Sequence, residues 1–295
     1  MKLAIQVLLA FTSPVALFAE NDAKAASPAQ AYRAILKDYN VVAGGFRKAK
    51  TDAERKAVAD RLDPFAPKFL DLAEKHADDP VALDALRMAV QAVVSRDSFV
   101  LQSWDRNETH LPLASTHKAP ARTSQILRAY VDSKRIIRIC DRMRYSVRNE
   151  YAEFLRSVLR TNPHREVQAV ACLSLAQSLI DRLRAADLGT DHPKMATCHA
   201  ELYGKDFPER AKRKHREKLN REIESLLERA AQYSDIEAPN GGTVAQRARR
   251  QIYDQRYLAA GKTAPDIAGL DQDGTQFKLS DYRGQIVLLY FWMEL

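Results

Sequence analysis

The chain has 295 residues, which is enough for about two domains. Hydrophobic residues make up 46% of the chain and glycine occurs only 10 times, so the composition excludes a disordered or a fibrous protein. The formal net charge of +8 permits an acidic partner but does not require one.

The N-terminus has the layout of a secretory signal peptide, residues 1–19. Lys2 gives a positive start, the stretch Leu3–Ala19 carries no charge, and a small residue precedes Glu20. We expect cleavage before Glu20, with a second option after Ala25. The predicted location of the mature protein is therefore the periplasm or the extracellular space.

An uncleaved membrane anchor is the rival interpretation of the same segment. Ser13 and Pro14 interrupt the apolar run, and its length of about 17 residues is at the short limit for crossing a bilayer. No later segment of the sequence is long and apolar enough to cross a membrane. We therefore expect no membrane span after signal removal.

The middle of the chain, residues 27–258, carries helical periodicity with start and stop signals. Ser27-Pro28 is a cap followed by a proline suited to the first helical position. Gly44-Gly45 is expected to bend or end that helix. Thr51 and Glu54 form a capping box for the next helix.

Prolines mark the boundaries that follow. Pro64 and Pro67 break the second helix or start a new segment, and Asp79-Pro80 opens another helix. From Trp104 to Pro120 the periodicity fades, which indicates a loop. The sequon Asn107-Glu108-Thr109 in this loop matters only in a eukaryotic secretory pathway.

Helical periodicity then resumes and continues to the end of the block. Residues 151–159 form one helix, and the short break Asn162-Pro163 leads into the next, which argues for an antiparallel pair. A long helix carries Leu219 to Ala230, and Pro239–Gly242 is predicted to end it. A last helix is expected from about Thr243 to Leu258.

Cys140, Cys172 and Cys198 are the three cysteines, and no two of them form a C-x-x-C pair. An odd number in an oxidising compartment leaves at least one unpaired, unless pairing is intermolecular. Cys140 and Cys172 follow apolar helical patterns, so we interpret them as small buried hydrophobes. The sequence leaves the pairing open.

Two further clusters contain residue types that are suited to ligand binding. His192, Cys198 and His199 are ligand types for zinc, but their spacing fits no standard site and an ordinary loop explains them better. The basic run Lys212–Arg216 suits phosphates, yet a solvated helix face paired at i to i+4 with nearby glutamates is the stronger interpretation. Export and the lack of interleaved aromatics argue against nucleic acid. We assign no catalytic, cofactor-binding or metal-binding residue.

The last stretch, residues 262–295, changes character. Asp273-Gly274 lies between two short apolar segments and favours a hairpin. Ser280 is placed to cap a short helical turn, and Gly284 is placed to end it. Ile286–Trp292 is unbroken and apolar, which predicts a strand covered on both faces.

The order of these features resembles the opening of exported thioredoxin-like proteins of the TlpA/ResA and AhpC/TSA (redoxin) type. The matching residues are Ala264-Pro265-Asp266, the turn Asp273-Gly274, Phe277–Gly284 and the strand that ends in Phe291-Trp292. The helical block resembles the α-helical region found ahead of the redoxin domain in some exported bacterial proteins. That region looks like stacked helix pairs, somewhat like tetratricopeptide repeats, although the sequence has no clean internal period.

The predicted fold class is therefore mainly α. A helical-hairpin N-terminal domain, residues 27–258, is followed by a truncated α/β thioredoxin-like segment, residues 262–295. In the resembling family a cysteine thiolate attacks a disulfide or peroxide, and a second cysteine resolves the intermediate. The family places its reactive cysteine a few residues after F-W, usually as W-C-x-x-C, whereas Trp292 is followed by Met293-Glu294-Leu295.

The resemblance implies a thiol–disulfide oxidoreductase or antioxidant without a cofactor. We expect this chain to lack that activity, because the C-x-x-C region is missing from it. The alternative is a helical protein-interaction module with a residual redoxin tail, which would bind a protein partner through the helical domain. An enzyme that uses Cys198 is a third possibility.

Overall fold

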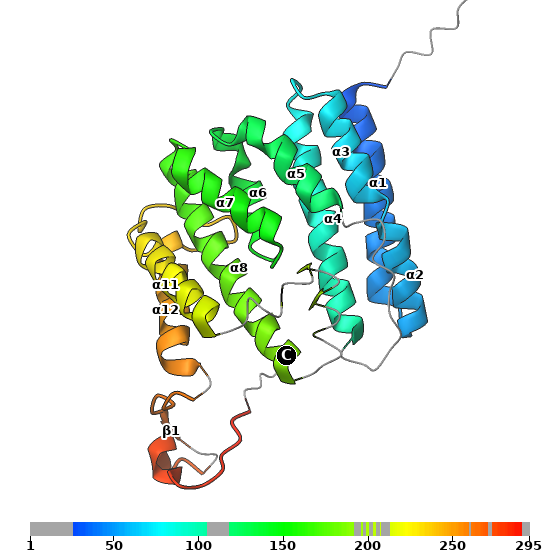
Figure 1. Ribbon diagram of the computed structural model, residues 1–295. Helices are drawn as coiled ribbons and strands as arrows, with labels where there is room; N and C mark the ends of the chain where they lie inside the picture. The colour runs from blue at the N-terminus through cyan, green and yellow to red at the C-terminus, as the bar shows by residue number, and fades with distance from the viewer. Residues whose placement is uncertain are drawn as a thin grey trace, which may run out of the picture.

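The computed structural model describes residues 26–104, 118–191, 213–259, 261–270 and 273–290, together with residues 196, 199, 200, 203, 204 and 207. Figure 1 shows the helices packed side by side in one body, with a small hairpin below it at the C-terminal end. The described residues are mostly helical, and their sheet has two strands. The prediction of a mainly α protein is confirmed. The predicted signal peptide and the sequon lie outside the described residues.

The first half of the helical body contains four helices. They are α1 (Pro28–Gly45), α2 (Asp52–Leu62), α3 (Phe65–Lys75) and α4 (Val81–Trp104), with the 3-10 turn η1 (Phe46–Lys48) after α1. Helix α3 packs along α4, and α1 lies against both of them (Figure 1).

The predicted start signals act as expected in this half. The Ser27 hydroxyl accepts a hydrogen bond from the Gln30 N–H at 3.3 Å, and the Gln30 side chain accepts one from the Ser27 N–H at 2.8 Å. Thr51 and Glu54 form the second capping box with 3.2 Å bonds in both directions. Each box satisfies two helix-terminal N–H groups that have no partner inside the helix.

The second half begins after the segment that lies outside the description. Its elements are α5 (Ala119–Leu127), η3 (Arg128–Tyr130), η4 (Lys134–Ile136), α6 (Ile137–Met143), α7 (Asn149–Thr161), α8 (Arg165–Asp191), α11 (Arg213–Ala230), α12 (Val244–Tyr253) and the π-helical turn η5 (Asp254–Leu258). Helix α8 contacts α6, α7, α11 and α12, and α6 also contacts α4. Helix α6 therefore joins the two halves.

One hydrophobic core extends through both halves. It includes Phe69 of α3, Leu86 of α4, Ile139 of α6 and Leu155 of α7, all at most 1% exposed. Among the described residues, Ile252 in α12 is the last that packs against this core. The core is therefore built by the helical block and includes nothing from the described part of the tail.

Charged side chains are also buried between the helices. Arg148, which precedes α7, donates from Nε and Nη2 to the two carboxylate oxygens of Asp97 in α4, at 2.6 and 2.7 Å. Both side chains are at most 5% exposed. Arg96, the preceding residue of α4, is likewise buried and bonds to Asp63.

The boundary predicted at Pro239–Gly242 is wrong by about two helical turns, because α11 ends at Ala230. The chain after α11 instead packs its own apolar side chains, and Ile236 and Ala238 are at most 6% exposed. The Val244 N–H donates to the Ile236 carbonyl at 2.9 Å, which holds this loop against the start of α12.

The tail forms the predicted hairpin. Strand β1 (Ala268–Leu270) pairs antiparallel with β2 (Gln276–Lys278), in a register that sets Gly269 opposite Phe277. Gly274 in the turn has φ +80°, a conformation that favours glycine. A 3-10 turn, η6 (Leu279–Tyr282), follows, and Gly284 after it has φ +87°.

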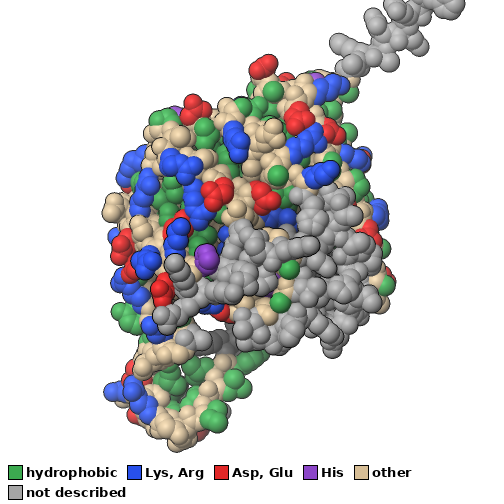
Figure 2. All heavy atoms as spheres, in the orientation of Figure 1, with side chains coloured by type: hydrophobic (Ala, Val, Ile, Leu, Met, Phe, Trp, Pro, Cys, Tyr) green, Lys and Arg blue, Asp and Glu red, His purple; other side chains and the backbone are tan. Residues whose placement is uncertain are grey.

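Two details of the tail differ from prediction. Residues 286–290 form no strand, because no strand among the described residues pairs with them; Phe291 and Trp292 lie outside the description. Leu288 is 92% exposed and Tyr290 81%, and Figure 2 shows apolar side chains on the surface of the tail. Ser280 does not cap η6; the carboxylate of Asp281 accepts from the Lys278 N–H instead, at 2.9 Å.

Within the described residues, none of the helices combines the length and the apolar composition that a membrane crossing requires.

We predict that Asp97→Ala destabilises the protein by about 3–5 kcal/mol, because it leaves the Arg148 guanidinium buried without its carboxylate. Urea denaturation followed by circular dichroism measures the change. The matched control is Asp235→Ala, which removes an exposed pair with Arg165 and should cost less than about 1 kcal/mol. Equal effects of the two substitutions would contradict this account of the core.

Deletion of residues 262–295 should leave the helical circular dichroism signal and the urea midpoint nearly unchanged, because the tail adds nothing to the described core. Deletion from Val244 onward is the control. It removes the buried Val244 and Ala248 of α12 and should unfold or strongly destabilise the helices. Unfolding by the shorter deletion would show that the boundary near Gly261 is misplaced.

Candidate functional site

The motif residues of the tail are joined by hydrogen bonds across the hairpin. The Asp266 carboxylate accepts from the Ser280 N–H at 2.8 Å and from the Ser280 hydroxyl at 2.9 Å. These bonds lower the pKa of Asp266, with the N–H bond of Ser280 as the largest cause. The A-P-D and L-S-D segments are therefore the two ends of one structural link, which closes the hairpin.

Cys140 and Cys172 are buried in the core, as predicted, and neither forms a disulfide. Burial raises the pKa of the Cys140 thiol to about 12 and that of Cys172 to about 11. A thiol needs to ionise and to be reached by its substrate in order to act as a nucleophile. Both are therefore unsuited to redox chemistry. Cys198 lies outside the described residues.

Of the three candidate zinc ligands, only His199 is described by the structure, since His192 and Cys198 lie outside the described residues. His199 is 1% exposed, and burial lowers its pKa. Its ring lies 5.8 Å from that of Tyr203 and 5.5 Å from that of Phe207. The part of the chain that the structure describes contains no group of three potential His, Cys, Asp or Glu ligands for a metal ion.

The basic run is described in part, because Lys212 and the side chains of Arg213 and Lys214 lie outside the description. Arg216 forms an ion pair with Asp187 of α8. Further along α11, Glu222 accepts two hydrogen bonds from Arg156 of α7, at 2.7 and 2.9 Å. Arg216 and Glu222 thus pair with other helices, and the pairing at i to i+4 within α11 stays a prediction.

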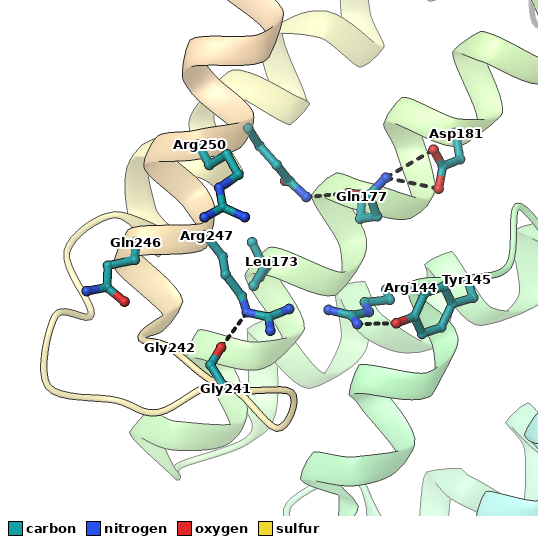
Figure 3. Close-up of a pocket in the computed structure, with 11 residues that line it drawn as sticks. Arg144, Tyr145, Leu173, Gln177, Asp181, Gly241, Gly242, Gln246, Arg247 and Arg250 are labelled. Carbon is teal, nitrogen blue, oxygen red and sulfur yellow. Dashed lines mark hydrogen bonds between the residues drawn. The ribbon is translucent and has the colours of Figure 1, made fainter. Parts of the chain in front are cut away.

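A cleft of about 410 Å³ lies where the end of α6, the middle of α8 and the start of α12 meet. Figure 3 shows the side chains around it. Its lining residues are Arg144, Tyr145, Leu173, Gln177, Asp181, Gly241, Gly242, Gln246, Arg247, Arg250 and Gln251. This cleft could not be predicted from the sequence, since its residues come from three separate segments and match no motif.

Hydrogen bonds hold several of the lining side chains in place. Arg247 donates from Nε to the Gly241 carbonyl at 2.9 Å. On the opposite wall, the Gln177 amide donates to both oxygens of Asp181 at 3.0 Å, and Gln251 donates to Gln177. Burial raises the pKa of Asp181. The cleft therefore has ordered walls of mixed polarity and an excess of arginine.

Comparison with known sequences gives one match, in the tail. The sequence model of the AhpC/TSA family matches residues 260–294, which include the hairpin and the Asp266–Ser280 link. Neither a curated protein nor a solved structure matches the chain. The C-terminal segment is thus similar to a redoxin-type segment, in agreement with the motifs of the sequence, and the helical block has no counterpart in these comparisons.

We predict that iodoacetamide at pH 8 leaves Cys140 and Cys172 unmodified in the native protein, because burial raises the pKa of both thiols and keeps the reagent from reaching them. Peptide mass spectrometry after short labelling measures the modification. Labelling in urea is the control, in which both should react. Rapid native modification of either cysteine would contradict the burial described above.

Proposed function

We propose that this protein is an exported member of the redoxin family, with an N-terminal helical domain, residues 27–258, ahead of a thioredoxin-like segment that begins near Lys262. The observation that carries the proposal is the Asp266–Ser280 link within the segment that the AhpC/TSA model matches. The link joins two motifs that are 14 residues apart. A chance match to one short motif would not explain why the residues of both motifs are hydrogen-bonded to each other across the hairpin.

The chemistry that the resemblance implies is thiol–disulfide exchange or peroxide reduction. Within this protein the tail would supply the opening hairpin of the thioredoxin-like fold, and none of the three cysteines would be the reactive one. Cys140 and Cys172 support this assignment, because both are buried and have raised thiol pKa values. The sequence of 295 residues also has no C-x-x-C pair.

A helical protein-interaction module is the second candidate function. The cleft between α6, α8 and α12 favours it, because the helical block has an ordered polar recess of its own. This function needs no cysteine and would be retained when the tail is removed. The two candidates are therefore separable by experiment.

The 295-residue chain should show no catalysed reduction of insulin by dithiothreitol above that of a free thiol. A variant with Cys140, Cys172 and Cys198 all changed to Ser is the matched control, and it should have the same rate as the unchanged protein. Turbidity of the insulin B chain measures the rate. Activity that disappears in Cys198→Ser alone would move the active site into the helical block.

In its native host, the protein should be found without its first residues. Mass spectrometry of the purified protein should find a mature N-terminus near Glu20 or Ala26, because Lys2 and the apolar stretch Leu3–Ala19 form a secretory signal. The control variant Leu8→Arg, which breaks the apolar stretch, should keep the precursor uncleaved. An intact Met1 on a cytoplasmic protein would refute export.

A further inference from the structure

We infer that the cleft between α6, α8 and α12 is a binding site for a small oxyanion, a ligand with a phosphate or carboxylate group. This inference does not depend on the redoxin resemblance, because every residue of the site belongs to the helical block. The cleft volume of about 410 Å³ falls in the range of small-molecule sites, about 300–1,000 Å³.

The charge of the lining points to an anion. Arg144, Arg247 and Arg250 line the cleft, against a single carboxylate, that of Asp181. That carboxylate is already engaged, since both of its oxygens accept from Gln177 at 3.0 Å. Arg144 is also paired with Asp141, so three arginines stand against two carboxylates, and an oxyanion would offset the remaining positive charge.

The arginines also have donor groups to offer. The Nε of Arg144 is buried and has no hydrogen-bond partner in the described structure, although its Nη groups contact Tyr145 and Asp141. Because this atom has almost no accessible surface, Arg144 contributes its positive charge to the cleft and not this donor. Arg250 is exposed, and its side chain has no hydrogen bond or ion pair with the described residues.

Figure 3 shows how the site is assembled. The side chains of Arg144 and Arg247 extend toward one another from opposite walls, and Arg250 lies one helical turn along α12 from Arg247. Arg247 uses Nε and Nη2 on the carbonyls of Gly241 and Asn240, which leaves Nη1 for a ligand. A guanidinium fork of this kind matches the geometry of phosphate and carboxylate oxygens.

The first turn of α12 adds to the positive character of the site. Gly242, Gln246 and Arg247 lie at the N-terminus of this ten-residue helix, where the helix dipole favours negative charge. Gln246 is held in a capping box with Thr243, with bonds of 3.0 and 3.2 Å. The wall is therefore ordered before any ligand binds, which reduces the entropy lost on binding.

The test is a calorimetric titration of the full chain at constant ionic strength, with inorganic phosphate in one arm and malonate in the other. We expect saturable binding of at least one anion. Tighter binding of phosphate would identify a phosphorylated ligand, and tighter binding of malonate a dicarboxylate. Failure of both anions to saturate would overturn the inference.

Substitution at Arg250 tests the site itself, because this side chain has no hydrogen bond or ion pair to lose among the described residues. Arg250→Glu should weaken anion binding about tenfold or more, since it replaces a hydrogen-bond donor by a carboxylate that repels the negatively charged ligand. Arg250→Lys should give an intermediate affinity, because it keeps the charge and loses the fork. Arg247 is left unchanged, since it also fixes the loop before α12.

The matched control is Arg249→Glu, which makes the same change of charge on the neighbouring residue of α12. Arg249 is exposed and does not line the cleft, so its effect on affinity should be less than about twofold. Thermal unfolding verifies that all variants fold. Equal weakening by Arg249→Glu and Arg250→Glu would show that the anion responds to the overall surface charge and not to the cleft, and would overturn the inference.

Discussion

The buried pair of Arg148 and Asp97 is the constraint on which the middle of the helical body depends. Asp97 belongs to α4 and Arg148 to the segment between α6 and α7. Two charges removed from water are tolerated only when they satisfy each other, so α4 and this segment are held in one relative position. The neighbouring pair of Arg96 and Asp63 ties the same helix to the turn after α2.

The position of the segment before α7 in turn shapes the cleft. Ser178 of α8 donates to the Ser146 carbonyl, and Arg182 donates to the Val147 carbonyl at 2.7 Å. The chain between α6 and α7 is therefore fixed on one side to α4 and on the other to α8. Arg144 and Tyr145 are the first two residues of this connection, and so one wall of the cleft follows from packing in the core.

The tail is ordered by local hydrogen bonds, whereas the helical body is ordered by burial of its side chains. The local bonds of the tail are those of the hairpin register and of the Asp266 carboxylate, and its apolar residues 286–290 are not buried. A thioredoxin-like sheet is stabilised by strands on both edges and helices on both faces. The described tail provides neither for residues 286–290, so the strand predicted there does not form and its apolar side chains are exposed.

The starts of the first helices of the block could be predicted from the sequence, because their signals are local. Capping boxes at Ser27 and Thr51 and the turn glycine Gly274 act within a few residues of their own position. The end of α11 could not be predicted in this way, since burial of Ile236 and Ala238 in the core decided it. The strand expected at Ile286 likewise needed sheet partners that local pattern does not supply. The arginine cleft was decided by tertiary structure alone, because Arg144 and Arg247 are distant in the chain and only the packing of α6, α8 and α12 brings their charges together.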